Sequence, residues 1–143
     1  MKSITTLLVT LSLLVHVFTG TARAEERNLS AVASKWNHNG SIMGLIVEGN
    51  QRTIVYVRPR AGLENLVRPG TVLFTGISTG NSYKGTARRF MPGLPPANYT
   101  VIGPITKNGS QVILRGMAPI RDAGGNVTKM VDDVLVFDLI SAK

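Results

Sequence analysis

One short stretch of the chain holds most of the side chains that could recognise a small molecule. It runs from Trp36, the only tryptophan, through His38 to Ser41, and Tyr56 follows in a β-rich run. An indole offers a flat apolar surface, whereas imidazole, hydroxyl and phenol groups offer directional hydrogen bonds. Trp36, His38, Ser41 and Tyr56 are therefore the candidate ligand-binding residues at the mouth of a barrel. The alternative, which we favour, is structural: Trp36 plugs one barrel end, and Asn39-Gly40 forms a turn.

The sequence offers little for catalysis or metal binding. Beyond the leader described below, His38 is the only histidine, and the chain has no cysteine. These counts exclude a multi-histidine or zinc–thiolate site, and the acidic residues lack the spacing of a calcium loop. A Ser-His-Asp triad assembles from distant positions, but no Gly-x-Ser-x-Gly motif supports one. We therefore predict a protein that is not an enzyme and that holds no cofactor and no metal.

Positive charge is the second chemical feature of the chain. Sixteen Lys and Arg residues stand against eight Asp and Glu residues, and two arginine pairs are prominent, Arg58/Arg60 and Arg88/Arg89. Such groups attract anionic polymers and lipid surfaces. Arg88 and Arg89 are neighbours in an expected strand, so their side chains should point to opposite faces. We assign these four arginines to anion or partner binding, with a surface that only aids solubility as the alternative.

The first 24 residues have the features of a cleavable secretory signal peptide. Lys2 precedes an apolar run, and Ala22-Arg23-Ala24 has the small-x-small pattern of a cleavage site. The run is short for a membrane span, and no later segment is long and apolar enough to form one. We predict cleavage after Ala24 and a periplasmic or secreted domain of residues 25–143. An uncleaved N-terminal anchor is the alternative.

The rest of the chain alternates β-rich runs with turn signals. Seven runs are predicted as strands because Gly, Pro or Asn clusters bound each of them. They are residues 42–48, 52–58, 71–76, 82–90, 99–102, 111–115 and 131–140. Gly49-Asn50-Gln51 is typical of a hairpin turn between the first two runs. Residues 28–35 are the only helix that we expect, capped by Asn28 or Ser30.

These elements predict a single all-β domain. The connections leave no room for crossover helices, so the sheet should be antiparallel. About seven strands in a small domain favour a closed or nearly closed barrel, which leaves no exposed sheet edges, and a β-sandwich is the runner-up. Residues 54–57 and 134–140 are apolar on both faces of their strands. A barrel interior on one side of these strands and a helix or a partner on the other would explain this pattern. The alternative is that short strands in small domains often lack a clean alternation.

The motifs resemble those of a family of small uncharacterised exported proteins from alphaproteobacteria related to rhizobia. The resemblance rests on segments spread over most of the domain, which are residues 36–43, 54–60, 70–76, 83–87, 99–103 and 114–119. It implies an exported globular protein. Members of that family carry cysteines in the later half, whereas this chain has none, so a disulfide is not carried over.

A fainter resemblance is to the avidins. Asn37, Ser41 and Tyr56 are similar to polar ligand-binding positions of that family. Avidins add further tryptophans that form the apolar wall of their biotin site, and no tryptophan follows Trp36 here. The resemblance therefore implies a barrel and carries no biotin site with it.

Three functional hypotheses follow from these features. The leading one is a non-enzymatic exported module that binds an anionic envelope polymer or lipid surface, or a partner protein, through arginine-bearing loops. The second is a carrier of a small ligand with its site at the barrel mouth. The third is an inhibitor of extracellular proteases that presents the proline-rich loop 91–96. Nucleic acid is not expected as a partner, because export and a low aromatic content argue against a base-stacking surface.

Overall fold

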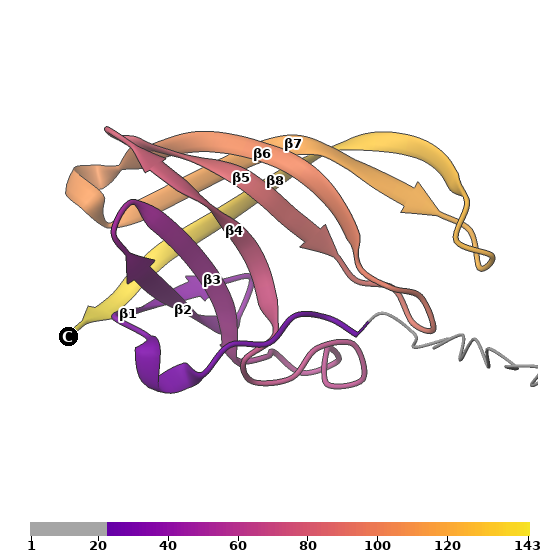
Figure 1. Cartoon of the computed structure of the whole chain (residues 1–143), viewed down its shortest axis with the longest axis horizontal. Coiled ribbons are helices and arrows are strands. Elements are labelled where there is room, and N and C mark those ends of the chain that lie inside the picture. The colour runs from indigo at the N-terminus through magenta and orange to yellow at the C-terminus, as the bar shows by residue number, and fades with distance from the viewer. Residues whose placement is uncertain (1–22) are drawn as a thin grey trace, which may run out of the picture.

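The computed structural model describes residues 23–143 as a closed barrel of eight antiparallel strands (Figure 1). Each strand pairs with its neighbour in sequence, and the last strand pairs with the first. The predicted all-β antiparallel barrel is thus confirmed. The predicted signal peptide lies outside the described residues except for its last two positions. Within the described part of the chain, no helix has the length and apolar character needed to cross a membrane.

Seven of the eight strands overlap the predicted runs. The strands are β1 (Ser34–His38), β2 (Ser41–Glu48), β3 (Gln51–Arg58), β4 (Val72–Thr79), β5 (Ser82–Arg89), β6 (Ala97–Thr106), β7 (Gln111–Arg121) and β8 (Val127–Ala142). The predicted count of about seven omitted β1, whose sequence Ser-Lys-Trp-Asn-His looks polar. The alternation of its side chains explains why β1 is a strand, since Trp36 and His38 are buried whereas Lys35 and Asn37 are exposed.

The predicted helix over residues 28–35 is wrong. Only one 3₁₀ turn forms, η1 (Leu29–Ala31), and the Asn28 side chain caps it by accepting a hydrogen bond from the Ser30 backbone N–H. The backbone becomes extended at Val32, and the Ala33 N–H donates to the Leu45 carbonyl on β2 at 2.8 Å. Pairing of the second half of this segment with β2 therefore stabilises the chain more than a helix of two turns would.

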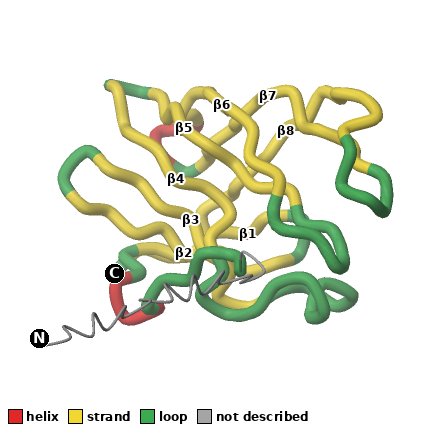
Figure 2. Tube along the Cα trace, turned by 45° about the vertical axis from the view of Figure 1, so that its right-hand side comes forward, coloured by secondary structure: helices red, strands yellow, loops and turns green. Residues whose placement is uncertain are grey.

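The same N-terminal segment covers one outer face of the barrel. Val32 packs there with Ile46, Val55 and Val72, all of them buried. Residues 25–27 add backbone bonds to the β3–β4 connection and β4, including Val72 N–H to the Glu25 carbonyl at 2.9 Å. The second apolar face of β3 is thus covered by the chain itself, where we predicted a helix or a partner. Figure 2 shows this segment and its short helical turn beside β2.

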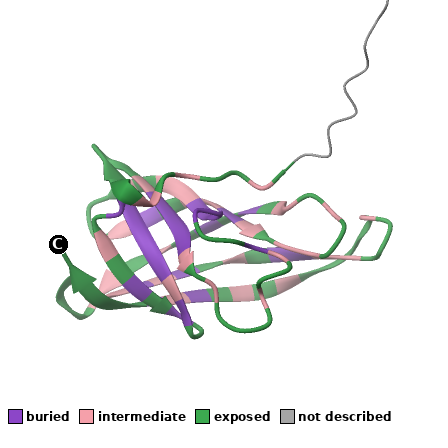
Figure 3. Cartoon of the chain, turned by 90° about the horizontal axis from the view of Figure 1, so that it is seen from below, coloured by how far each residue is buried: buried purple, intermediate pink, exposed green. Residues whose placement is uncertain are grey.

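The barrel interior is filled with side chains. Aromatic and aliphatic residues from all eight strands form one cluster, and Met43, Phe74 and Leu114 are completely buried. Figure 3 shows the buried residues gathered along the strands, whereas the loops and the C-terminal end are exposed. Burial of this apolar surface supplies the main stabilisation of a chain without disulfides.

Two-residue turns set the register of the first hairpins. Asn39 and Gly40 have φ of 51° and 87° and connect His38 to its cross-strand partner Ser41. Positive φ at both central residues is the geometry that Asn-Gly favours between twisted strands. Gly49, with φ of 62°, begins a two-residue turn of another type between β2 and β3, because Asn50 does not share the positive φ. The hairpin predicted there is confirmed.

Candidate functional site

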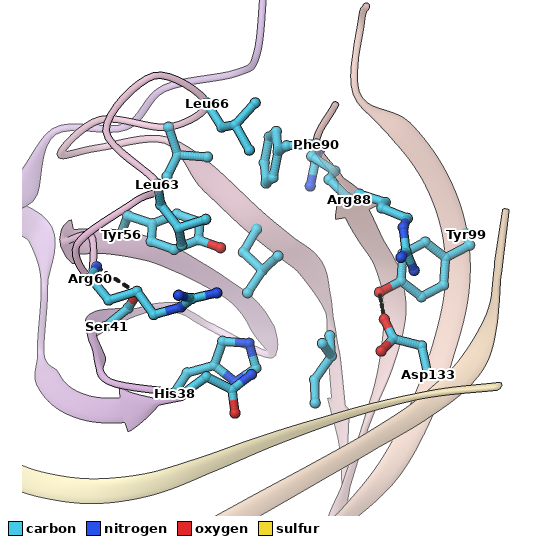
Figure 4. A pocket seen from close by; sticks show the side chains of 15 residues that line it. His38, Ser41, Tyr56, Arg60, Leu63, Leu66, Arg88, Phe90, Tyr99 and Asp133 are labelled. Carbon is cyan, nitrogen blue, oxygen red and sulfur yellow. Dashed lines mark hydrogen bonds between the residues drawn. The ribbon is translucent and has the colours of Figure 1, made fainter. Parts of the chain in front are cut away.

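A cavity of about 280 Å³ lies at the mouth of the barrel, beneath the connection between β3 and β4 (Figure 4). Strands β1 to β6 and β8 each contribute side chains to it. Its polar and charged lining is His38, Asn39, Ser41, Tyr56, Arg60, Arg88, Arg89, Tyr99 and Asp133, and its apolar lining is Leu63, Leu66, Val67, Leu73, Phe90 and Leu135. The cavity therefore joins an apolar wall to several hydrogen-bonding groups, as ligand sites do.

The β3–β4 connection over this cavity is firmly held. The Ser41 hydroxyl accepts a hydrogen bond from the Arg60 backbone N–H at 2.9 Å, and Ser41 itself is buried. A single turn follows in which the Val67 N–H donates to the Leu63 carbonyl at 3.0 Å. The Thr71 hydroxyl then accepts from the Arg68 N–H. Ser41, predicted as a ligand-binding residue, thus also fixes the roof of the cavity.

His38 is a neutral ring that is held in place through Nδ1, which leaves Nε2 free to meet a ligand. Its Nδ1 lies 2.9 Å from the Val136 carbonyl oxygen, and because a carbonyl only accepts, Nδ1 carries the proton. The ring stacks on Phe137 at 4.7 Å between centroids. Burial lowers the pKa of His38, although the Val136 hydrogen bond and the Asp133 charge oppose this shift. Nε2 is therefore a hydrogen-bond acceptor on the cavity lining at neutral pH.

Tyr56 is a fixed hydrogen-bond donor on the same wall. Burial raises its pKa to about 12, against a smaller opposing effect of the Arg60 charge. Its ring meets Phe90 edge to face at 6.2 Å. The phenol therefore stays protonated at any physiological pH, and its hydroxyl can donate to a ligand.

Tyr99 and Asp133 form a pair on the opposite wall, where the Tyr99 hydroxyl donates to Asp133 Oδ2 (Figure 4). Burial raises the pKa of Tyr99, and the hydrogen bond to the neighbouring carboxylate raises it further. Neither residue was among the predicted site residues. The alternation of side chains along β6 and β8 was the one sequence pattern that could have identified them, because Tyr99 and Asp133 share the inward face with Val101 and Leu135.

The four predicted arginines do not form one surface. Arg60 and Arg89 line the cavity and carry no ion pair within residues 23–143, and each acts on a lining tyrosine, Arg60 on Tyr56 and Arg89 on Tyr99. Arg88 also touches the cavity, but its Nη2 is paired with Glu25 at 2.8 Å. Arg58 is exposed and lies outside the lining. Two free positive charges are thus concentrated at the barrel mouth.

Trp36 lies away from this cavity. Its indole is buried in the barrel core, and Nε1 donates to the Ser34 hydroxyl at 2.8 Å. His38 is the next inward-facing residue of β1 and reaches the mouth. The arrangement therefore places three of the four predicted ligand-binding residues together. It places Trp36 in the core cluster, and the plug at one barrel end that we favoured for this residue stays a prediction.

The proline-rich loop 91–96 is anchored to the rest of the barrel. Arg121 Nη1 on β7 donates to the Pro95 carbonyl at 2.8 Å. A Cβ added at Gly125 in the β7–β8 turn would lie 3.4 Å from Leu94 Cδ2, so Leu94 lies close to this turn. This anchoring suits a structural role for the loop, and the inhibitor hypothesis stays a prediction. Across residues 23–143, no three His, Cys, Asp or Glu side chains gather where they could hold a metal ion.

The lowered pKa of His38 makes stability depend on pH in a defined direction. The unfolded chain takes up a proton near the ordinary value of 6.5, whereas the folded chain does so only at lower pH. The contribution of His38 to the free energy of unfolding is therefore fully present above pH 6.5, and it is lost as the pH falls from there through the pKa of the folded chain. Urea unfolding at several pH values should show this slope, and His38→Asn, which keeps a donor for Val136, should flatten it. An equal slope in both proteins would contradict the assignment.

Comparisons of the chain with models of protein families, with curated proteins and with solved structures found no match. The resemblances to exported proteins and to avidins therefore stay predictions.

Proposed function

We propose that this protein binds a small organic anion in the cavity at the barrel mouth, without transforming it. The observation that carries the proposal is that Arg60 and Arg89, which have no ion pair within residues 23–143, line one cavity of about 280 Å³ together with a neutral His38 and a protonated Tyr56. This volume is near the lower end of the range of ligand sites, about 300–1,000 Å³. The ligand should therefore be small.

The lining also defines the chemistry of that ligand. A carboxylate or phosphate can accept hydrogen bonds from guanidinium groups, and these bonds are stronger than those between neutral groups. Tyr56 adds a neutral donor, and His38 Nε2 accepts from a hydroxyl or amide group. The leucines of the roof and Leu135 face the remaining volume. These groups fit a molecule with one acidic head and a compact apolar or aromatic body.

A binding role fits these groups better than catalysis. The hydrogen bond of His38 goes to a backbone carbonyl, so within the described residues no carboxylate orients the ring and no hydroxyl is activated by it. Asp133 is engaged by Tyr99. Among residues 23–143, the cavity therefore offers hydrogen bonds and charge to a ligand, and no relay for moving protons.

Charge selectivity is the property to measure. Benzoate and benzamide are nearly equal in shape and differ in charge, so NMR titration with both separates charge from fit. We expect benzoate to shift the resonances of Tyr56 and His38 at concentrations where benzamide has no effect. Arg60→Gln and Arg89→Gln should each weaken benzoate binding about tenfold, which corresponds to the loss of one charge-assisted hydrogen bond.

Arg58→Gln is the matched control, because it removes the same charge from an exposed position outside the cavity. Its benzoate affinity should equal that of the unaltered protein in moderate salt. Equal binding of benzamide and benzoate, or an Arg58→Gln effect as large as that of Arg60→Gln, would refute a charge-selective cavity. Retention on an anionic polysaccharide that depends on Arg58 would instead favour the envelope-polymer hypothesis.

A further inference from the structure

Strand β8 has an open edge along half of its length. One side of it pairs with β7 from Val127 to Asp138, whereas the other side pairs with β1 only from Asp138 to Ala142. Within residues 23–143, no strand pairs with this second edge between Val127 and Leu135. Figure 1 shows the β7–β8 hairpin reaching out at the right, beyond the short strands β1 to β3. A free edge of this kind is a template for another strand.

Two hydrogen bonds identify the backbone groups at the open edge. His38 on the β1 side donates to the Val136 carbonyl, and the Leu139 N–H donates to Ser110 on the β7 side. Backbone groups alternate between the two sides of a strand, and β8 keeps one register through this region. Met130, Asp132 and Val134 therefore direct their N–H and C=O groups away from β7, toward the open side.

The neighbouring edge of β7 is protected, which makes the contrast informative. Pro119 has no N–H to offer there, and Arg121 holds the proline-rich loop against this side of the hairpin. The edge of β8 contains no proline, and three of the side chains along it are apolar and exposed: Val127 at 58%, Met130 at 48% and Val134 at 40%. The charged side chains of Lys129 and Asp132 are exposed on the same stretch. One edge of the hairpin is thus blocked and the other is left available.

We propose that a second copy of this chain pairs with β8 along this edge, antiparallel and with the two-fold axis at Val131. In this register Met130 lies opposite Asp132, so the outward backbone groups of both copies meet. Lys129 of each copy lies opposite Asp133 of the other, which gives two pairs of opposite charge. Registers centred on Asp132 or Asp133 would place like charges opposite each other. The sequence of the edge is therefore complementary to itself.

This pairing would also change the rim of the cavity. Asp133 is a lining residue, so Lys129 of the second copy would add a positive group next to it. On the outer face, Met130 would lie opposite Asp132 and diagonally next to Val134 of the second copy, so that these apolar side chains would lose part of their contact with water. The proposal is independent of the proposed function, because the edge forms a dimer whether or not the cavity holds a ligand.

Analytical ultracentrifugation of the natural mature protein, over a series of concentrations, tests for the dimer. We expect a monomer–dimer equilibrium in which Lys129→Glu raises the dissociation constant at least tenfold, whereas Lys84→Glu, the same change on the outer face of β5, has no effect. Met130→Pro removes an outward N–H without touching the β7 ladder, so it should abolish the dimer and leave the circular dichroism spectrum unchanged.

Hydrogen exchange locates the contact. Amides of Met130, Asp132 and Val134 should gain protection as concentration rises, in step with the fraction of dimer. A monomer at every concentration would overturn the proposal, and so would a dimer that is indifferent to Lys129→Glu and Met130→Pro. Protection of β8 that appears only when an extended peptide from another protein is added would overturn it in favour of a heterologous strand partner.

Discussion

Gly103→Ala prevents the barrel from folding, or lowers its free energy of unfolding by more than about 4 kcal/mol. A Cβ at position 103 would lie 1.6 Å from the Ile113 carbonyl oxygen and 2.7 Å from its carbon. Both atoms belong to the backbone of β7, so no side-chain rotation can make room. The two strands would have to separate at a point where β6 and β7 already lack regular pairing between Ile102 and Ile105.

The stability of small domains is itself about 5–15 kcal/mol, so a loss of this size removes most of it. Chemical denaturation of Gly103→Ala beside Gly124→Ala measures the effect. Gly124 lies in the exposed β7–β8 turn, where the nearest atom to an added Cβ is Asn126 Nδ2 at 3.3 Å. That side chain can move, so the control should change stability by less than about 1 kcal/mol. A stable, folded Gly103→Ala protein would disprove the close approach of β6 and β7.

Much of the fold could be predicted because turn residues and strand patterns agree along most of the chain. Gly49 and Asn50 join two β-rich runs, and the resulting hairpin sets the register of β2 and β3. β1 was missed because it is short and only Trp36 and His38 face the core. β1 pairs with the adjacent strand β2 and with the distant strand β8. The pairing with β8 joins opposite ends of the chain, so no pattern of neighbouring residues predicts it.

The candidate site was predictable only in part, for a geometric reason. His38, Ser41 and Tyr56 meet because a tight turn joins β1 to β2 and because β2 pairs with β3, which are local relations. Tyr99 and Asp133 reach the same cavity through closure of the barrel, which no local pattern encodes. The adjacent arginines Arg88 and Arg89 were expected to point to opposite faces. Arg88 pairs with Glu25 whereas Arg89 acts on Tyr99, yet both arginines reach the lining of the same cavity.

Phe137→Ala should lower the free energy of unfolding by about 3–5 kcal/mol, the range for a buried aromatic side chain replaced by alanine. Phe137 is 1% exposed and lies in the main core cluster. Its loss removes apolar burial and leaves a hole beside Leu135 and Val112 that the surrounding strands cannot close. Ile140→Ala on the same strand is the control, because Ile140 is 54% exposed and should change stability by less than about 1 kcal/mol.

Phe137 also connects the core to the site, since it is the ring on which His38 stacks. Phe137→Leu keeps most of the buried volume but removes the flat surface, so it separates packing from orientation. We expect this variant to retain most of its stability, while the His38 ring loses its fixed position and becomes better hydrated. The pKa of His38 should then rise toward its ordinary value of 6.5, which an NMR titration of the ring protons measures. An unchanged pKa would mean that the Val136 carbonyl alone orients the ring, and that the stack on Phe137 contributes only to the core.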